Sequence, residues 1–136
     1  MAVALVKQSI DLGIVTTNGE AMLRFYRDVL GLKYLREIPF PALGAGVVMH
    51  QMACGESVIK LVVAPQLPAK APPGPIAAAS GYRYWTMTVS NLDEMVAACA
   101  AAGITVGLPR TQVRPGVSVA IVLDPDGNLV EFLALG

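Results

Sequence analysis

The sequence predicts an α+β protein made of two copies of one β-α-β-β-β unit. Apolar runs of strand length recur along the chain, each half holds one stretch with helical periodicity, and a proline-rich segment separates the halves. The chain has 136 residues with 54% hydrophobic and 15% charged content, which suits one compact domain with a large core. We expect a single domain over 1–136, with a first module at 8–63, a linker at 64–80 and a second module at 81–136.

The first module begins with a short apolar strand at 10–15 that carries one acid, Asp11. Thr17 and Glu20 have the spacing of a capping box, so a helix is expected to follow. Apolar residues then recur at helical spacing, and Gly31 is placed for the C-terminal cap. Three further strands are expected at 32–38, 47–53 and 58–63, the last two joined by a turn at 54–57.

The segment 64–80 interrupts this pattern. It contains five prolines among many alanines, and proline removes a backbone donor and fixes φ. We therefore expect a linker without a strand or a long helix.

The second half repeats the order of elements. A strand is expected at 82–89, a helix from the capping-box spacing at Asn91 to Gly103, a short strand at 104–107 and a loop at 109–116. The apolar runs 117–123 and 129–135 predict a closing hairpin, because the Asp-Pro-Asp-Gly sequence between them favours a tight turn.

Composition and charge exclude several classes of function. A net charge of zero without a basic cluster argues against nucleic-acid binding. No apolar run is long enough to span a membrane, and residues 1–6 are too short for a signal peptide. Cys54 and Cys99 lack the spacing of a metal or redox motif, so we expect two reduced thiols in a cytoplasmic protein.

One carboxylate, Glu131, interrupts the apolar closing strand. A buried carboxylate is costly unless it is paired, hydrogen-bonded or bound to metal. Glu131 therefore either reaches water from one face of the strand or marks a functional site.

Three stretches carry a resemblance to a known family: residues 11–15 (Asp-Leu-Gly-Ile-Val), the helix phrase at 23–32 with Phe25-Tyr26 and Leu30-Gly31-Leu32, and residues 124–131 with the Asp-Pro-Asp-Gly turn. In this order, within a duplicated unit, the chain resembles the vicinal oxygen chelate superfamily of glyoxalases, bleomycin-resistance proteins and extradiol dioxygenases. The resemblance implies an eight-stranded, half-open barrel with helices outside and a cup inside.

In metal-dependent members, the resemblance implies that each module supplies a ligand from its first and its last strand. Here those positions hold Asp11, Lys60, Tyr84 and Glu131. An ammonium has no lone pair for a metal, and the sole histidine, His50, is at none of the four positions. We therefore expect a protein without a metal or another cofactor.

Strand alternation places residues i and i+2 on one face. Matching the modules aligns Asp11 with Tyr84, Lys60 with Glu131 and His50 with Ile121, and predicts that all of these side chains face the cup. The candidate catalytic residues are Asp11, His50, Lys60, Tyr84 and Glu131. The candidate substrate-binding residues are Val48, Val58, Val62, Thr86, Ile121 and Leu133.

Three functions remain open. In a metal-independent lyase or isomerase acting on a small organic molecule, His50, Asp11 or Glu131 would move a proton while Lys60 or Tyr84 steadied an oxyanion. A drug-sequestering binding protein would need no acid–base pair, although the neutral, aromatic-poor chain is a poor match for cationic bleomycin. A divergent metal-dependent glyoxalase or dioxygenase ranks third because of Lys60.

Each candidate also has a structural interpretation. Lys60 is expected to pair with Asp11 or Glu131, and that pair could simply fill a former metal site. His50 could be a satisfied core histidine, and Tyr84 a packing aromatic. As partners we expect a small-molecule ligand and, from the family's habit of pairing modules between chains, a second copy of this chain, but neither nucleic acid nor membrane.

Overall fold

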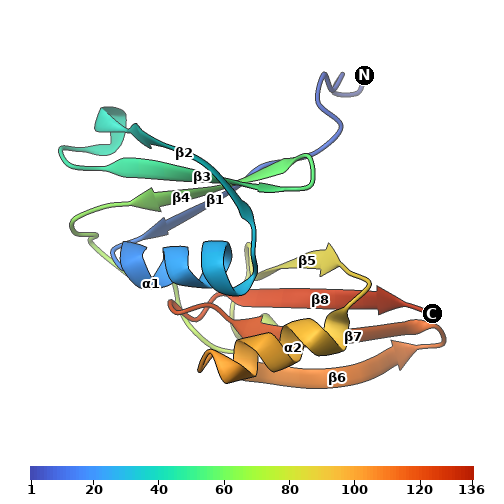
Figure 1. Ribbon diagram of the computed structural model, residues 1–136. Helices are drawn as coiled ribbons and strands as arrows, with labels where there is room; N and C mark the ends of the chain where they lie inside the picture. The colour runs from blue at the N-terminus through green and yellow to red at the C-terminus, as the bar shows by residue number, and fades with distance from the viewer. The chain divides into compact units, whose positions relative to one another are not determined.

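The computed structural model describes residues 1–136, which divide into two compact units, Met1–Pro68 and Ala69–Gly136. The division falls inside the predicted linker. Each unit holds one four-stranded sheet and one long helical segment, so the predicted α+β class with two β-α-β-β-β modules is confirmed (Figure 1). We describe each module by itself. No helix in the structure has both the length and the apolarity to cross a membrane.

The elements of the first module follow the predicted order. They are β1 (Leu12–Thr16), α1 (Gly19–Leu23) continued by a π-helical segment (Arg24–Val29), β2 (Lys33–Pro39), a 3-10 turn (Pro41–Leu43), β3 (Val48–Cys54) and β4 (Ser57–Val63). Asp11 therefore lies just before β1 rather than within the strand.

The helix of the first module begins differently from the prediction. Asn18 is the N-cap residue and no side chain caps the helix, so the capping box expected at Thr17 and Glu20 does not form. Instead, the hydroxyl oxygen of Thr16 accepts a hydrogen bond of 2.8 Å from the Asn18 N–H. The helix buries Met22, Phe25 and Tyr26 completely, and Gly31 ends it with φ +74°, as expected for a glycine cap.

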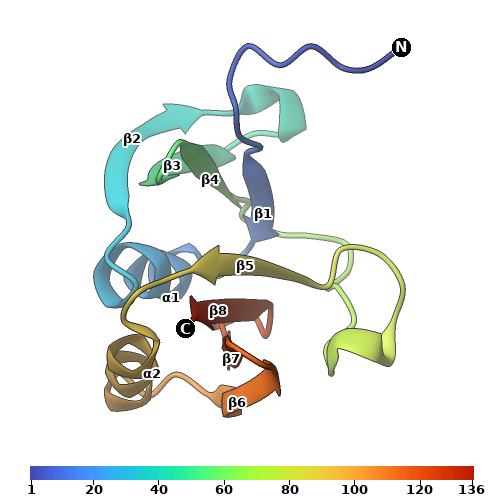
Figure 2. The same ribbon diagram turned by 90° about the vertical axis from the view of Figure 1, so that its right-hand side faces the viewer.

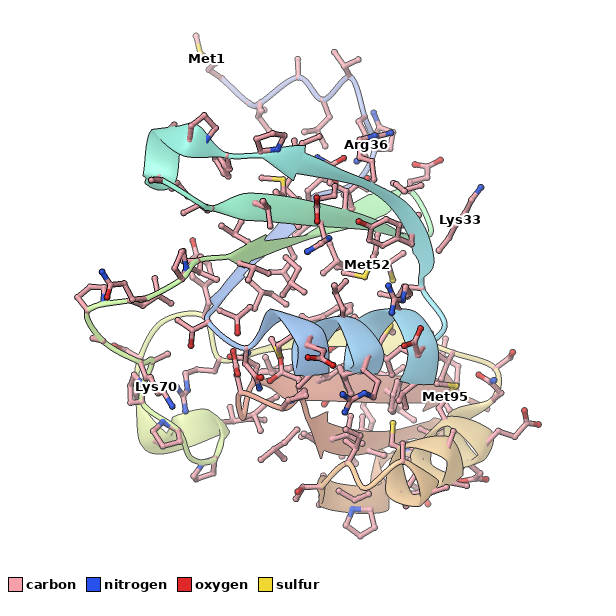
Figure 3. The ribbon with its side chains drawn as sticks, turned by 60° about the vertical axis from the view of Figure 1, so that its left-hand side comes forward. Met1, Lys33, Arg36, Met52, Lys70 and Met95 are labelled. Atoms are coloured by element: carbon pink, nitrogen blue, oxygen red, sulfur yellow. The ribbon has the colours of Figure 1, made fainter.

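The helix covers one face of the first sheet, whose strand order is β1-β4-β3-β2. A Cβ placed on Gly19 would lie 2.7 Å from the Val63 side chain, so Val63 faces the helix. Met52 shares this face and lies between sheet and helix, whereas Arg36 lies on the other side of the sheet (Figure 3). We call the first side the helix-covered face and the second the helix-free face.

The second module contains a 3-10 turn (Ile76–Ala78), β5 (Tyr84–Thr88), α2 (Leu92–Ala101), β6 (Val106–Arg114), β7 (Val117–Leu123) and β8 (Leu129–Leu135). The closing hairpin has the predicted bounds. Asn91 is the N-cap of α2 without a side-chain cap, and Gly103 ends the helix with φ +79°. Figure 2 shows α2 beside the sheet of its own module.

The loop predicted at 109–116 is wrong, because β6 continues to Arg114. Proline usually interrupts a strand, but β6 is an edge strand in the order β5-β8-β7-β6. The pairing also shifts between Leu108 and Thr111, so Pro109 falls where the ladder is irregular. An edge position with a bulge tolerates the missing N–H of proline.

The predicted linker is held to the second module by one side chain. The Arg83 guanidinium donates four hydrogen bonds of 3.0–3.4 Å to backbone carbonyls. The acceptors belong to Pro72, Gly74, Pro75 and Ile76. The Pro75 carbonyl also accepts a backbone hydrogen bond from Ala78 in the 3-10 turn, and the arginine adds side-chain donors to a segment with little regular backbone pairing.

The closing turn is organised by the buried carboxylate of Asp124, which is 3% exposed. One of its oxygens accepts hydrogen bonds of 2.9 Å from the N–H groups of Asp126 and Asn128, and the other accepts one of 2.8 Å from the Asn128 side chain. Gly127 takes φ +89° within the turn. Asp124 thus sets the register of β7 against β8, and with it the face on which Glu131 lies.

We expect Asp124→Ala to lower the free energy of unfolding by about 2–4 kcal/mol, because several bonds to one buried carboxylate are lost together. Urea denaturation followed by circular dichroism would measure the change. The control is Glu56→Ala, an exposed acid in the β3–β4 turn, which should change stability by less than about 0.5 kcal/mol. Equal effects of the two substitutions would contradict the role given to Asp124.

Candidate functional site

The helix-free face of the first sheet carries a row of polar positions across all four strands. Gly13 on β1 is paired with Lys60 on β4, Lys60 with Gln51 on β3, and Gln51 with Arg36 on β2. Directly paired residues lie on the same face of a sheet. Lys60, Gln51 and Arg36 are therefore neighbours on this face.

Two contacts connect the outer part of this row. The Arg36 guanidinium donates a hydrogen bond to the side-chain oxygen of Gln51, and the Gln51 amide nitrogen lies 3.4 Å from the sulfur of Met49. Arg36 reaches this face because the pairing shifts between Tyr34 and Arg36, which leaves Leu35 as an extra residue in β2. Without the bulge, strict alternation would place Arg36 on the same face as Tyr34.

Asp11 lies directly before β1, and its carboxylate is engaged in structural contacts. Its carboxylate lies 2.6 Å from the ammonium nitrogen of Lys7 and accepts a hydrogen bond of 2.8 Å from the Val58 N–H. The hydrogen bond from Lys7, the bond from Val58 and, more weakly, the charge of Lys60 lower the pKa of Asp11. The carboxylate therefore stays ionised and structurally engaged.

The expected pairing of Lys60 with Asp11 does not form, because Lys7 takes that place. Lys60 is half-buried and lies between Gly13 and Gln51, with Val58 and Val62 at the neighbouring positions on the same face of β4. Lys60 thus forms no ion pair in its own module, and its charge acts on the Asp11 carboxylate only at longer range.

The prediction that His50 faces the same side as Lys60 is wrong. His50 is paired with Leu61, one residue beyond Lys60, and therefore lies on the helix-covered face. There its Nδ1 lies 2.9 Å from the Tyr34 hydroxyl and its Nε2 3.6 Å from a Glu37 oxygen. His50 is 9% exposed as a residue, so the interpretation as a satisfied core histidine fits best.

Val48 shares the error made for His50. It is paired with Val63, which faces the helix, so Val48 cannot line the helix-free face. Both errors come from a register between the modules that is one residue out. The structure pairs Gln51 with Lys60 and Ile121 with Glu131, so the counterpart of Ile121 is Gln51.

The second module places the other candidate residues together on its helix-free face. Glu131 on β8 is paired with Thr86 on β5 and with Ile121 on β7. The Thr86 hydroxyl donates a hydrogen bond of 2.8 Å to Oε1 of Glu131. Tyr84 and Leu133 lie on the same face, and Tyr84 is 49% exposed. The opposite face is packed with fully buried residues such as Val130 and Phe132.

Sequence reasoning missed Gln51 and Arg36. A signal for Gln51 was present, because counting back from the turn at Gly55 and Glu56 places Gln51 across from Lys60. Arg36 had no such signal, since its orientation depends on the bulge at Leu35.

The donor set of each module is a poor match for the metal that the resemblance implies. In the first module the Asp11 carboxylate is engaged by Lys7 and Val58, and the second position is an ammonium. In the second module Glu131 accepts from Thr86, and its companion Tyr84 is a phenol. No group of three or more acidic, histidine or cysteine side chains is arranged to hold a metal ion. The first module therefore offers no free carboxylate and the second offers one, which is too few donors for a transition metal.

Comparison with known proteins supports the resemblance. The model of the Glyoxalase/Bleomycin resistance protein/Dioxygenase superfamily matches residues 9–132. A glyoxalase family protein from Enterococcus faecalis is 25% identical, covering 94% of this chain and 98% of its own, with a TM-score of 0.74.

Two further solved structures share the fold at 22% identity. A glyoxalase family protein from Bacillus cereus has a TM-score of 0.82, covering 100% of this chain and 99% of its own. The lactoylglutathione lyase from Agrobacterium tumefaciens has a TM-score of 0.65, covering 93% and 92%. No curated protein sequence matches the chain.

We predict that protein purified without chelator contains less than about a tenth of a transition metal per chain, because the ligand positions lack enough donors. Elemental analysis of the purified protein measures this content. Near-stoichiometric zinc, nickel or iron that disappears in Glu131→Gln would contradict the prediction.

The lowered pKa of Asp11 predicts a pH dependence of stability. A carboxyl group with a lowered pKa in the folded state stabilises the protein above its ordinary pKa of 3.8. That contribution is lost as the pH falls through the lower, folded value. Urea midpoints between pH 2 and pH 6 should therefore fall less steeply in acid for Asp11→Asn than for the wild type. Unchanged steepness, matching that of a Glu56→Gln control, would show that the contacts of Asp11 do not contribute.

Proposed function

Because the chain belongs to the Glyoxalase/Bleomycin resistance protein/Dioxygenase superfamily, we propose that it acts on a small organic molecule as a metal-independent lyase or isomerase. The proposed reaction moves a proton on a carbon next to a carbonyl group. Glu131, on the helix-free face of the second module, is the proposed base. The proposed class of reaction rests on membership of the superfamily. The role proposed for each residue rests on the side chains around it.

The hydrogen bond between Thr86 and Glu131 is the observation that carries this proposal. It fixes Oε1 of the carboxylate at 2.8 Å from the hydroxyl and leaves Oε2 to accept a proton from a ligand. Glu131 has apolar neighbours, since Ile121 is paired with it and Leu133 follows on the same face. A positioned carboxylate with apolar neighbours is the arrangement that a general base requires.

Tyr84 is the proposed partner of Glu131. It lies on the adjacent strand, two residues along from Thr86 and on the same face, and half of its surface is exposed. A phenol can donate a hydrogen bond to an oxygen that gains negative charge when the neighbouring carbon loses its proton. The proton taken by Glu131 would return to the product carbon, so the reaction consumes no other reactant.

A second function, ligand binding without catalysis, is favoured by the placement of two other candidates. His50 lies on the helix-covered face, and Asp11 is engaged by Lys7 and Val58. The set of titratable candidates in the first module is therefore reduced to Lys60. A divergent metal-dependent enzyme, such as the lactoylglutathione lyase with the same fold, ranks last because the donor set fits a metal poorly.

We expect Glu131→Gln to reduce turnover by at least about a hundredfold, because the amide keeps the shape and cannot accept the proton. Proton NMR in deuterated water would measure solvent exchange on a panel of small ketones, aldehydes, 2-oxo acids and lactoylglutathione. The matched control is Glu20→Gln on the exposed surface of α1, which should leave exchange unchanged. Ligand-induced stabilisation without any exchange would instead support the binding protein.

We also propose that the protein is a homodimer. The family supports this assembly, and both β1 and β5 are edge strands whose unpaired backbone groups need cover. Val15 on β1 and Tyr84 on β5 are each about half exposed. The neutral chain and its two free cysteines are compatible with a cytoplasmic protein that does not bind nucleic acid.

Light scattering coupled to size exclusion should give about twice the chain mass of 14.2 kDa at low micromolar concentration. A single 14.2 kDa species over the same concentration range would reject the dimer.

A further inference from the structure

The helix-free face of the first sheet is divided into a polar row and an apolar row. The polar row is formed by Gly13, Lys60, Gln51 and Arg36. The next row, two residues along each strand, is wholly apolar and is formed by Val15, Val62, Met49 and Ile38. Met49 and Val62 are buried in an apolar cluster on which Ile38 packs, whereas Val15 is half exposed. The polar row is half-buried or exposed at every position, so it is the part of this face that a ligand can reach.

The polar row carries two positive charges, and neither forms an ion pair with an acid of the first module, although the charge of Lys60 acts on the Asp11 carboxylate. The ion pairs of that module use other groups, namely Lys7 with Asp11, Arg24 with Glu20, and Arg27 with Asp28. Arg36 donates a hydrogen bond to the Gln51 amide, and Lys60 is paired with Gln51 across the two strands. Glu37, the acid nearest along β2, is on the opposite face.

An open space lies next to Lys60. Gly13 occupies the β1 position of the polar row, and a Cβ placed there would meet no atom within 4 Å. Glycine weakens a strand because it has no side chain to pack and loses more entropy on folding. Its presence in β1 is explained if a ligand approaches the backbone at this point.

We propose that the polar row binds the oxyanion group of a small organic anion, with Lys60, Gln51 and Arg36 as its polar contacts and the half-exposed Val15 as the neighbouring apolar contact. Adjacent strands are about 4.8 Å apart, so the backbones of Lys60 and Arg36 are separated by about 10 Å. Their long side chains can reach one anion from both sides of Gln51. Lysine provides a point charge, and arginine provides a planar fork that suits carboxylate and phosphate oxygens.

If the protein is the proposed enzyme, the anion that binds to this row is its substrate. The assignment of a substrate class therefore rests on the proposed function. Carboxylates and phosphate esters share the oxyanion chemistry that the row would recognise. The ligand is thus the opposite in charge of the cationic drugs bound by bleomycin-resistance proteins.

Nitrogen-15 NMR titration of the full chain at constant ionic strength tests the inference. The probes are hexanoate, inorganic phosphate, the neutral isostere hexanamide and the cation hexylammonium. We expect hexanoate to shift the Gly13 amide and the Gln51 side-chain amide in a saturable way, and hexanamide and hexylammonium not to do so. Stronger binding of hexanoate than of phosphate would identify carboxylates as the natural class, and the reverse would identify phosphates.

Three variants make the titration specific. Lys60→Gln should weaken hexanoate binding at least about tenfold, the loss expected for one charge-assisted hydrogen bond. Arg24→Gln removes the same charge from the exposed helix surface and should bind as the wild type does. Gly13→Val should raise the melting temperature, because valine favours strands, and yet weaken binding by filling the space beside Lys60.

Equal shifts with hexanoate and hexylammonium, or equal binding by Lys60→Gln and Arg24→Gln, would overturn the inference. The titration measures binding to residues of the first module, and it does not depend on whether the protein catalyses a reaction. Lys60-dependent binding without proton exchange would therefore reject only the lyase or isomerase. Exchange on a neutral compound without Lys60-dependent binding would reject only the anion site.

Discussion

Side-chain alternation in sheets that each pack one helix on one face is the constraint on which the candidate site depends. Each strand residue faces either its helix or the opposite side, and its neighbour faces the other way. The helix-covered faces hold fully buried residues such as Met52 and Phe132. Only residues of the opposite parity can meet a ligand outside the helix-packed cores. A shift of one residue along a strand therefore moves a side chain from the helix-free face, where it can meet a ligand, to the helix-covered face, where it packs. Gln51 and His50 are neighbours in β3 that differ in this way.

Equivalent positions on the helix-free faces of the two modules carry side chains of opposite charge. The row that contains glycine, lysine, glutamine and arginine in the first module contains Thr86, Glu131, Ile121 and Leu108 in the second. The first row is cationic and the second has one carboxylate in apolar surroundings. The three inner strands of the two modules share this pairing, and different residues at equivalent positions separate a proposed anion-binding surface from a proposed base. Each role can thus be tested within its own module.

The sequence was sufficient for the order of elements, because strands, helices and glycine caps have local signals. The closing hairpin was placed with its observed bounds, since Asp124 to Gly127 specify the turn. Features that depend on pairing between strands could not be predicted from the sequence of a single strand. The bulge at Leu35 and the irregular pairing around Pro109 follow from the neighbouring strand, and neither leaves a pattern within its own segment.

The placement of site residues was predictable where the turn fixed the register and was wrong where it was taken from a match between modules. Glu131, Thr86 and Ile121 lie on the face that was expected. His50 and Val48 do not, because the modules were matched one residue out of step. Asp11 lies just before β1 instead of within the predicted strand, and its contact with Lys7 could not be foreseen from a segment without secondary structure.

The most direct test of this account is a nuclear Overhauser spectrum of the only histidine in the chain. Because His50 is unique, its ring protons can be assigned without ambiguity. The account predicts cross-peaks from the His50 ring to the Tyr34 ring and to the Met52 methyl group, both on the helix-covered face. Cross-peaks from the His50 ring to the side chains of Lys60 and Val62, without any to Tyr34, would place His50 on the helix-free face and contradict the assignment of both rows.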